Sequence, residues 1–482
     1  MTERARAPAR AAACALVLAA ALGACKAVGP DFQPPAAPGA SGYLMIGDAA
    51  SPIAEMSPDA HPAGAWWTSF GSPDLDAVMR LALADNPTLA AANATLDRTR
   101  QQAAAVRGAE LPQAQLDANG ERERINIAAF GFSGFPNPTI NLYSVGGTVT
   151  YDLDLFGGRR RAAEAALAKA QADARRADAA YLTLTGQVAL TAVEIATYRD
   201  QIATLASVIA DDQRTIDMGQ RAAAAGGAPS AAAASPRAQL AQDQALLAPL
   251  EQQLSQARHN LALLVGKSPA EWSAPDFDLA SLAAPASVPV SLPSALVRRR
   301  PDILAAEADL HAATANIGVA TAALYPDVRL SANLTQTALS PFKLFSYSAS
   351  GWSFGAGLTQ PLFKGGTLKA DKRAAEADAR LAMARYQQTV LTAFVQVADV
   401  MEAIAHDDEQ IAALRRAEDA AGASLRDAQN AYRLGGGALF AVIDAQRQVS
   451  QARRFRAMVE GRRTADIAQL YVVTAADWRQ AT

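Results

Sequence analysis

The sequence predicts a mixed α+β membrane protein assembled from two similar halves. Three features predict this class: residues recur at a nearly constant offset, two long segments lack proline, and four short segments alternate strictly between apolar and polar side chains. Strict alternation is typical of β-strands, and long alanine-rich segments without proline favour helices. We therefore expect each half to contain helices and strands in the same order.

The internal twofold repeat is found by comparing the chain with itself. Pro112 and Pro326 are separated by the same number of residues as Pro87 and Pro301. A register kept over many such positions indicates a duplication. Each repeat is expected to hold a helix, a β-hairpin and a long helical hairpin. The expected segments are residues 74–266 for the first repeat, 267–292 for an equatorial linker, 293–475 for the second repeat and 476–482 for a C-terminal tail.

The N-terminus resembles a bacterial lipoprotein signal peptide. Residues 1–24 contain a basic start with three arginines and an apolar run that is too short to span a bilayer. The run ends in Leu22-Gly23-Ala24-Cys25, and small residues directly before a cysteine are typical of a lipobox. We expect Cys25 to carry lipid, including palmitate, and residues 25–73 to form an extended, lipid-anchored segment. No cofactor is expected beyond this covalent lipid.

Two proline-free segments, residues 160–221 and 368–433, predict one very long helix in each repeat. At about 1.5 Å per residue, such a helix is on the order of 90–100 Å long. A glycine-rich break follows each segment, and a second apolar-periodic segment returns over residues 231–265 and 439–474. Glycine breaks between such segments indicate antiparallel helical hairpins that form a coiled coil.

The four predicted strands carry apolar side chains on one face and polar side chains on the other. The apolar positions are Ala114, Leu116 and Ala118, then Val149, Tyr151, Leu153 and Leu155, then Val328, Leu330, Ala332 and Leu334, then Trp352, Phe354, Ala356 and Leu358. A half-exposed sheet of a soluble protein would show the same alternation. The signal peptide and the aromatic residues favour a membrane barrel with an apolar outside and a wet lumen.

Four strands are too few to close such a barrel, because the smallest outer-membrane barrels need about eight. The missing strands must come from identical neighbours. Two copies would give about eight strands around a filled interior, and three would give about twelve around an aqueous bore. The strands alone leave both assemblies open.

The composition argues against nucleic-acid binding and against catalysis. The chain carries 44 basic and 47 acidic residues, for a net charge of −3, whereas nucleic-acid-binding proteins usually have a basic excess. The four histidines, His61, His259, His311 and His406, are dispersed, so no metal site is predicted. No P-loop occurs, so any energy must come from a partner. We expect no enzymatic activity.

Several short motifs lie in a characteristic order along the chain. In this order they are Val28-Gly29-Pro30-Asp31-Phe32, Asp154-Leu155-Phe156-Gly157, Leu292-Pro293-Ser294 before Arg298-Arg299-Arg300-Pro301-Asp302-Ile303, Pro361-Leu362-Phe363, and Tyr432-Arg433-Leu434-Gly435 before Val442-Ile443-Asp444-Ala445-Gln446. Their order and spacing resemble the outer-membrane factor family of the TolC and OprM type, in particular its lipoprotein branch. The resemblance implies a homotrimer with a twelve-stranded β-barrel, four strands per chain, continuous with a long α-helical periplasmic tunnel.

The same resemblance implies functional sites at the ends of the helical hairpins. The turns that meet a periplasmic adaptor protein in that family are expected at Gly226, Gly227 and Ala228, and at Arg433, Gly435, Gly436 and Gly437. Glycines let a partner approach the backbone, and the alternative is that they serve the turn alone. Asp444 matches an aspartate of the periplasmic gate, but a helix dipole would also favour a carboxylate there. Ala441 and Ser235 replace acidic residues common in the family, which puts a strong double aspartate ring in doubt.

The function implied by the resemblance is an outer-membrane channel lipoprotein of a tripartite efflux system, of the kind that gives multidrug resistance. It would conduct substrates passively from an inner-membrane pump, expected to be proton-driven, through the adaptor to the exterior. In bacterial lipoproteins, an aspartate directly after the lipidated cysteine favours retention in the inner membrane. Lys26 occupies this position here, so the resemblance implies the outer membrane. Two alternatives stay open: the duct of type I protein secretion, and a periplasmic adaptor lipoprotein, which should show one hairpin beside a lipoyl-like domain.

Overall fold

The structure, a computed structural model, describes residues 27–48, 54–57, 65–131, 134, 136–226, 234–282, 285 and 287–474. The contacts divide the chain into two compact units. The first unit comprises Met1–Pro35, Leu96–Asp173 and Ala306–Tyr386, and the second comprises Ala36–Thr95, Ala174–Ala305 and Gln387–Thr482. Each unit takes segments from both halves of the chain, because the two longest helices pass from one unit into the other.

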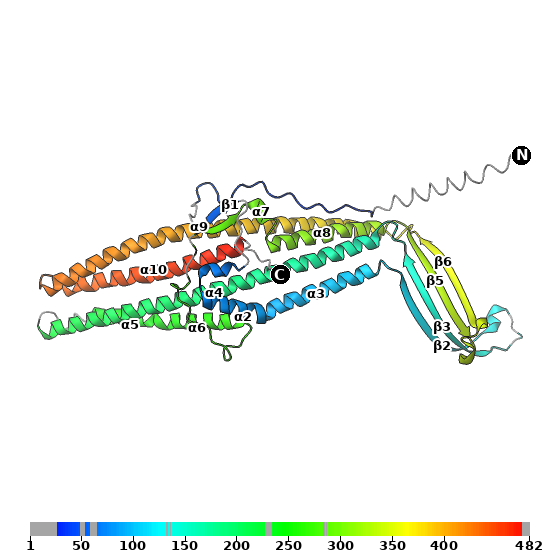
Figure 1. Cartoon of the computed structure of the whole chain (residues 1–482), viewed down its shortest axis with the longest axis horizontal. Helices are drawn as coiled ribbons and strands as arrows, with labels where there is room; N and C mark the ends of the chain where they lie inside the picture. Colours follow the sequence, from blue (N-terminus) through cyan, green and yellow to red (C-terminus); the bar gives the residue numbers. More distant parts are fainter. Residues whose placement is uncertain are drawn as a thin grey trace. The chain divides into compact units, whose positions relative to one another are not determined.

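The first unit contains a four-stranded antiparallel sheet in the order β2-β3-β5-β6 (Figure 1). The strands are β2 (Gln113–Arg124), β3 (Thr139–Asp152), β5 (Asp327–Ala338) and β6 (Ser350–Thr359). Their connecting loops contain the short 3-10 helices η2 (Ile127–Phe130), η4 (Pro341–Lys343) and η5 (Tyr347–Ala349). The four predicted strands are confirmed, but the second was predicted to run to Leu155 and ends at Asp152. Asp154 takes a left-handed φ of 44°, which turns the chain out of the strand.

Two very long helices follow the strand pairs, as predicted. α4 (Gly158–Ala224) and α9 (Thr367–Arg433) contain 67 residues each. Both begin and end within a few residues of the proline-free segments, because alanine favours the helix and no proline interrupts it. By length and composition alone, each contains a stretch apolar enough to cross a membrane. This is weak support for a membrane span, since the core helices of soluble proteins pass the same test.

Both long helices return as antiparallel hairpins in the second unit. α9 returns as α10 (Leu439–Val473), as predicted, and ion pairs such as Arg415–Glu460 at 3.0 Å join the two. α4 returns as two helices, α5 (Ala234–Ala245) and α6 (Leu247–Leu264), and the prediction of one continuous helix was wrong. Pro249 explains the break at Leu246, because its ring clashes with the carbonyl four residues earlier.

Shorter helices lead into each strand pair. α2 (Pro73–Asp85) and α3 (Pro87–Gly108) precede β2, and α7 (Pro293–Leu296) and α8 (Pro301–Ala322) precede β5. Asn86 separates α2 from α3. The Asn86 carboxamide accepts a hydrogen bond from the N–H of Leu89 at 3.0 Å and donates one to the Leu264 carbonyl at 2.8 Å. Asn86 therefore starts α3 and also ties it to the end of the first hairpin.

An additional layer in the second unit was not predicted. β1 (Ala54–Ser57) pairs in parallel with β4 (Val288–Ser291), and the 3-10 helix η1 (Trp66–Phe70) packs beside α10. The Trp66 ring stacks on Tyr471 with 5.2 Å between centroids. The stacking connects the N-terminal segment to the end of α10, and the strand pair connects it to the segment that precedes α7.

Candidate functional site: the strand faces, their base and the helix turns

Strand register sorts the side chains of the sheet onto two chemically different faces. Leu334 lies opposite Trp352, and the next pair along the same strands, Asn333 and Ser353, faces the other side. The apolar face carries Ala114, Leu116, Ala118, Val149, Tyr151, Val328, Leu330, Ala332, Leu334, Trp352, Phe354, Ala356 and Leu358. The polar face carries Gln115, Asp117, Asn119, Thr148, Thr150, Asp152, Arg329, Ser331, Asn333, Ser353 and Thr359. The predicted alternation therefore runs in register across all four strands.

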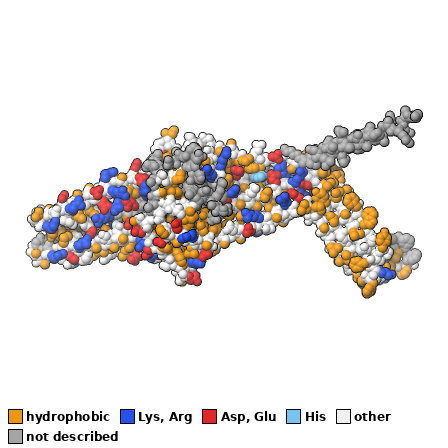
Figure 2. All heavy atoms as spheres, viewed as in Figure 1, with side chains coloured by type: hydrophobic (Ala, Val, Ile, Leu, Met, Phe, Trp, Pro, Cys, Tyr) orange, Lys and Arg blue, Asp and Glu red, His pale blue; other side chains and the backbone are white. Residues whose placement is uncertain are grey.

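The apolar face is uncovered in the single chain. Trp352, Phe354 and Leu358 expose 81%, 72% and 69% of their surface, and Figure 2 shows hydrophobic side chains gathered over the strands. Soluble proteins rarely expose so large an apolar area. A face of this kind suits contact with hydrocarbon.

Both edges of the sheet lack a strand partner among the described residues. β2 pairs only with β3, and β6 pairs only with β5. Each edge therefore presents a row of backbone N–H and C=O groups that can pair with another chain. A sheet that is apolar on one face and open at both edges can be extended by strands of another chain.

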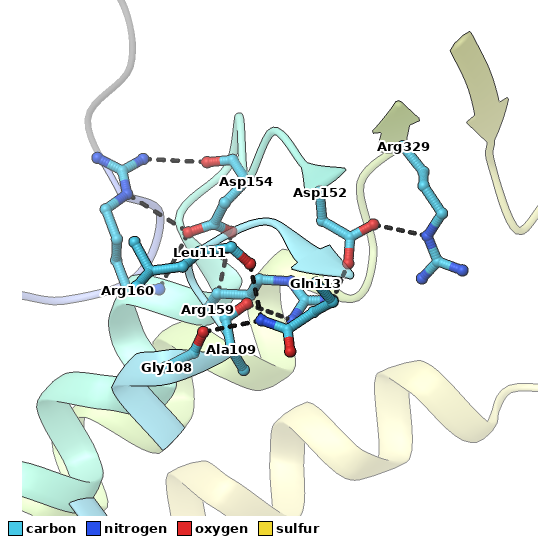
Figure 3. A network of polar contacts seen from close by, with 9 residues as sticks. All are labelled: Gly108, Ala109, Leu111, Gln113, Asp152, Asp154, Arg159, Arg160 and Arg329. Atoms are coloured by element: carbon cyan, nitrogen blue, oxygen red, sulfur yellow. Dashed lines mark hydrogen bonds and ion pairs between the residues drawn. The ribbon is translucent and has the colours of Figure 1, made fainter. Parts of the chain in front are cut away.

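An ion-pair network fastens the base of the strands to α4 (Figure 3). Asp152, at the end of β3, accepts a hydrogen bond from Arg329 Nε of β5 at 2.7 Å and also pairs with Arg159. The carboxylate of Asp154 accepts hydrogen bonds from the backbone N–H groups of Arg159 at 2.9 Å and Arg160 at 3.0 Å. A carboxylate at this position satisfies free N–H groups and favours the helix start. The motif that begins at Asp154 thus ends a strand and starts the long helix.

A second network, the N-terminal clasp, consists of Asp31, Phe32, Arg161, Glu164 and His311. Arg161 is buried and donates to Asp31 at 2.6 Å and to Glu164 at 2.8 Å. Glu164 also lies 2.9 Å from His311 Nε2, and the histidine ring stacks on Phe32 with 4.4 Å between centroids. Burial opposes the charge of Glu164, but the hydrogen bonds from His311 and Arg161 outweigh it and lower the pKa of that carboxyl. The clasp fixes the segment that follows Cys25, which itself lies outside the described residues.

Two glycines allow the chain segments of this clasp to approach closely. A Cβ on Gly29, whose φ is 92°, would lie 2.5 Å from the Cα of Gly318. A Cβ on Gly318 would in turn lie 2.7 Å from Cγ of Arg161. Only glycine fits at both positions. This accounts for the glycine in the motif at Val28–Phe32.

The turn between α9 and α10 is described in full, whereas the turn after α4 is described only to Gly226. Gly226 and Gly435 follow the ends of the two long helices with left-handed φ angles of 71° and 78°. The N–H of Gly436 donates to the Ala431 carbonyl at 3.0 Å, a pattern that closes a helix end. The predicted residues Gly227 and Ala228 lie outside the described residues. Arg433 bonds to the Asn430 side chain beside the turn.

The glycines of the second turn differ in what surrounds them. A Cβ on Gly437 would lie 2.9 Å from the Cβ of Ala431, so Gly437 is required by the turn itself. Gly435 has open space around it, and the atom nearest to a Cβ on Gly436 is 4.0 Å away. Leu434 and Phe440 flank the turn and expose 87% and 72% of their surface. No pattern in the sequence predicts that these two apolar side chains are exposed, because their exposure depends on the geometry of the turn.

Asp444 lies in α10 beyond its first turn, so the helix dipole has little effect on it. Its carboxylate accepts hydrogen bonds from Arg447 at 3.0 Å and Gln448 at 2.9 Å. It lines a cavity of about 90 Å³ that α4 and α5 line from the other side, with Asp212 and Gln239 among the lining residues. Among the described residues, no group of three or more His, Cys, Asp or Glu side chains could hold a metal ion.

Comparison with known proteins identifies the family. The model of the outer membrane efflux protein family matches residues 78–267 and 292–476. OpmQ of Pseudomonas aeruginosa, a pyoverdine export outer membrane protein, is 28% identical over 426 residues, which cover 87% of this chain and 89% of OpmQ. TtgC of Pseudomonas putida, a probable efflux pump outer membrane protein, is 29% identical over 456 residues, which cover 91% of this chain and 90% of TtgC.

Solved structures agree with this assignment. The outer-membrane channel OprN superposes with a TM-score of 0.85 at 27% identity, over 94% of this chain and 99% of OprN. The motifs at Asp154–Gly157 and Arg298–Ile303, which predicted the family, therefore lie in a chain with both the sequence and the fold of such channels. The chain belongs to the outer membrane efflux protein family.

Proposed function

We propose that the chain is the outer-membrane channel subunit of a tripartite efflux system and conducts substrates passively to the exterior. One observation carries the proposal: a sheet with an apolar face, a polar face and two open edges occurs in a chain of an outer-membrane efflux family. An apolar outside and a wet inside are the requirements of a transmembrane barrel. An adaptor and a proton-driven inner-membrane pump would supply substrate and energy.

The channel in this proposal is a homotrimer. Three copies of the four-stranded sheet give about twelve strands, which leave an aqueous bore, whereas about eight would be filled by side chains. The open edges of β2 and β6 support pairing between copies. An internal twofold repeat is supported by the two segments that the family model matches and by the same order of helix, strand pair, long helix and return helix in each.

We also propose that Cys25 carries lipid, including palmitate, and anchors the chain in the outer membrane. The N-terminal clasp supports this, because it holds the residues that follow Cys25 on the same compact unit as the sheet. Labelled palmitate should be incorporated into the wild-type chain and not into the Cys25→Ser variant. Equal labelling of both would contradict this site.

The helix turns are the proposed docking surface for the adaptor, at Gly226, Gly227, Ala228, Arg433, Gly435, Gly436 and Gly437. The exposed side chains of Leu434 and Phe440 add apolar surface at the second turn. Asp444 is the proposed gate residue, and threefold symmetry would bring three copies of its carboxylate toward one axis. Like charges held close together attract cations.

Gly436 gives a clean test of docking, because its surroundings within the chain are open. A deletion strain is complemented with wild-type, Gly436→Leu or Gly42→Leu protein and tested against antibiotics, dyes, solvents and metals. We expect Gly436→Leu to abolish resistance while trimers still form, because the new side chain blocks only a partner. Gly42→Leu is the matched control, since Gly42 is equally open and lies in the N-terminal segment. Full resistance with Gly436→Leu would contradict docking at this turn.

A further inference from the structure

We propose that the first helical hairpin contains a proton-binding site, formed by Asp212 of α4 and Asp243 of α5, and that one shared proton holds the two helices together. The inference goes beyond the conduction of substrates, because it assigns a ligand to a buried site between two helices. It does not depend on which substrates are exported.

Two buried carboxyl groups meet at this site. Asp212 and Asp243 expose only 8% and 2% of their surface. Their side chains lie within hydrogen-bonding reach of one another. Oδ2 of Asp212 is fully buried and accepts no hydrogen bond from any residue that the structure describes. A buried carboxylate oxygen without a donor is costly, and a proton between the two carboxyl groups would supply the missing donor.

The charges around the pair are too few to neutralise both carboxylates. Asp243 accepts hydrogen bonds from Arg454 of α10 and from Gln239 of α5, each at 2.8 Å. Asp211, on α4 itself, adds a further negative charge near Asp212. The charged groups that face Asp212 are Asp211 from α4, Asp243 from α5, and Arg454, Arg447 and Asp444 from α10. Arg447 is already paired with Asp444 at 3.0 Å, and Asp211 is paired with Arg214 and Arg453. Arg454 compensates one carboxylate, and a proton is needed for the other.

The surroundings of the pair cause this proton to dissociate near neutral pH. Burial, followed by the contacts with Asp243 and Asp211, raises the pKa of Asp212 from 3.8 to about 7, against the opposing charge of Arg454. Because the pKa is higher in the folded state, the added stability is fully present below about pH 4 and is lost as the pH rises through about 7. This trend is opposite to ordinary acid denaturation.

Protons can reach the pair through an adjoining cavity. The cavity has a volume of about 280 Å³, and all of the residues that line it are polar. Its lining residues are Asp212, Gln239, Asp243, Arg447, Ser450, Gln451 and Arg454. A polar cavity of this size holds water. The shared proton can therefore exchange with solvent without unfolding of the hairpin.

A second pair in the other hairpin shows the same arrangement independently. Asp407 of α9 is 2% exposed, and its Oδ1 accepts a hydrogen bond from Arg462 Nε at 2.8 Å. Its Oδ2 is buried and has no donor among the described residues. Asp466 of α10 lies within hydrogen-bonding reach of Asp407, and burial and this contact raise the pKa of Asp466 to about 6. In each hairpin two carboxyl groups from its two helices thus meet, and an arginine of α10 pairs with one of them in both cases.

Hydrogen–deuterium exchange on the full-length protein in detergent tests the site. Exchange of α5 amides is compared at about pH 5.5 and about pH 7.5, after correction for intrinsic rates. Proton linkage predicts that opening increases on the order of tenfold over this range in the wild-type protein. Asp212→Asn should remove the increase, because an amide does not ionise and can donate to Asp243.

Matched controls separate this effect from a general change in charge. Asp217→Asn removes a partly exposed carboxylate from the same helix and should keep the wild-type pH dependence. Asp466→Asn should remove the pH dependence of α10 amides, and Asp427→Asn on α9 is its control. A wild-type protein whose corrected α5 exchange is the same at both pH values would overturn the proposal, whatever the variants do. Retention of the increase in a folded Asp212→Asn protein would overturn it as well.

Discussion

At the scale of single residues, the structure compensates buried charges one by one. Arg161 is 5% exposed, yet Asp31 and Glu164 both accept hydrogen bonds from it. Removal of one member of a buried ion pair leaves the other charge without compensation, which costs roughly 3–5 kcal/mol. Residues of the N-terminal clasp should therefore tolerate substitution poorly, even though the clasp includes residues close to the start of the described chain.

Arg161→Gln should release the N-terminal segment and lower the free energy of unfolding of its unit by roughly 3 kcal/mol. A glutamine at this position carries no charge and cannot donate to Asp31 and Glu164 at the same time. Faster proteolysis within residues 27–35 and a lower unfolding midpoint would show this. Arg98→Gln, at an exposed position on α3, should change stability by less than about 0.5 kcal/mol. Equal protease resistance of Arg161→Gln and the wild-type chain would contradict a role for the clasp.

At the scale of elements, the two faces of a strand have different requirements. Phe354 and Ser353 are neighbours on β6, but one lies on the apolar face and the other on the polar face. A charge that faces lipid near the middle of a membrane costs roughly 2–4 kcal/mol, whereas a charge in a wet lumen costs little. A lysine should therefore prevent membrane assembly at the position on the apolar face and be tolerated at the adjacent position on the polar face.

Phe354→Lys should prevent accumulation of the protein in the outer membrane, whereas Ser353→Lys should leave it assembled. The amount of heat-modifiable, detergent-resistant oligomer in outer-membrane fractions measures the difference. The two variants add the same charge to the same strand, so only the face differs. Equal assembly of both would show that this sheet does not contact lipid with its apolar face.

The elements themselves were largely predictable from the sequence. Alternation located all four strands and assigned their faces, and proline-free alanine-rich segments located α4 and α9. The end of β3 was not predicted, because it depends on Asp154 adopting a left-handed φ while its carboxylate caps α4. The break between α5 and α6 was predictable from Pro249 and was missed.

The candidate sites were less predictable, because they depend on tertiary contacts. The glycine turns follow directly from the sequence, but the difference between packed Gly437 and open Gly436 requires coordinates. The pairing of Asp212 with Asp243 depends on how α4 and α5 are rotated against each other. No local pattern encodes that rotation. The stacking of Trp66 on Tyr471 joins segments from opposite ends of the chain and had no sequence signal either.

At the scale of the whole molecule, the open edges of β2 and β6 are the surfaces through which the proposed trimer would close. Closure requires β6 of one copy to pair with β2 of the next, so that the edges disappear. In such a pair, directly opposite side chains on one face lie about 5 Å apart. Cysteines placed there can form disulfide bonds between copies.

Leu116→Cys in β2 should therefore form disulfides when it is combined with a cysteine at the facing apolar position of β6. Trp352, Phe354, Ala356 and Leu358 are replaced by cysteine one at a time to find this position. We expect the matching pair to give covalent species of up to three chains on non-reducing gels. Val149→Cys in the central strand β3, combined with the same β6 positions, is the control and should give none. A ladder that stops at two chains would contradict a trimer.

The open edges also have a genetic consequence. In a threefold barrel every chain must supply both edges, so a single copy that cannot pair leaves the ring incomplete. If normal and pairing-defective chains are made in equal amounts and mix at random, only about one assembly in eight contains normal chains alone. An allele that damages β2 or β6 should therefore be dominant over the normal allele, whereas an allele that destroys the whole chain should be recessive.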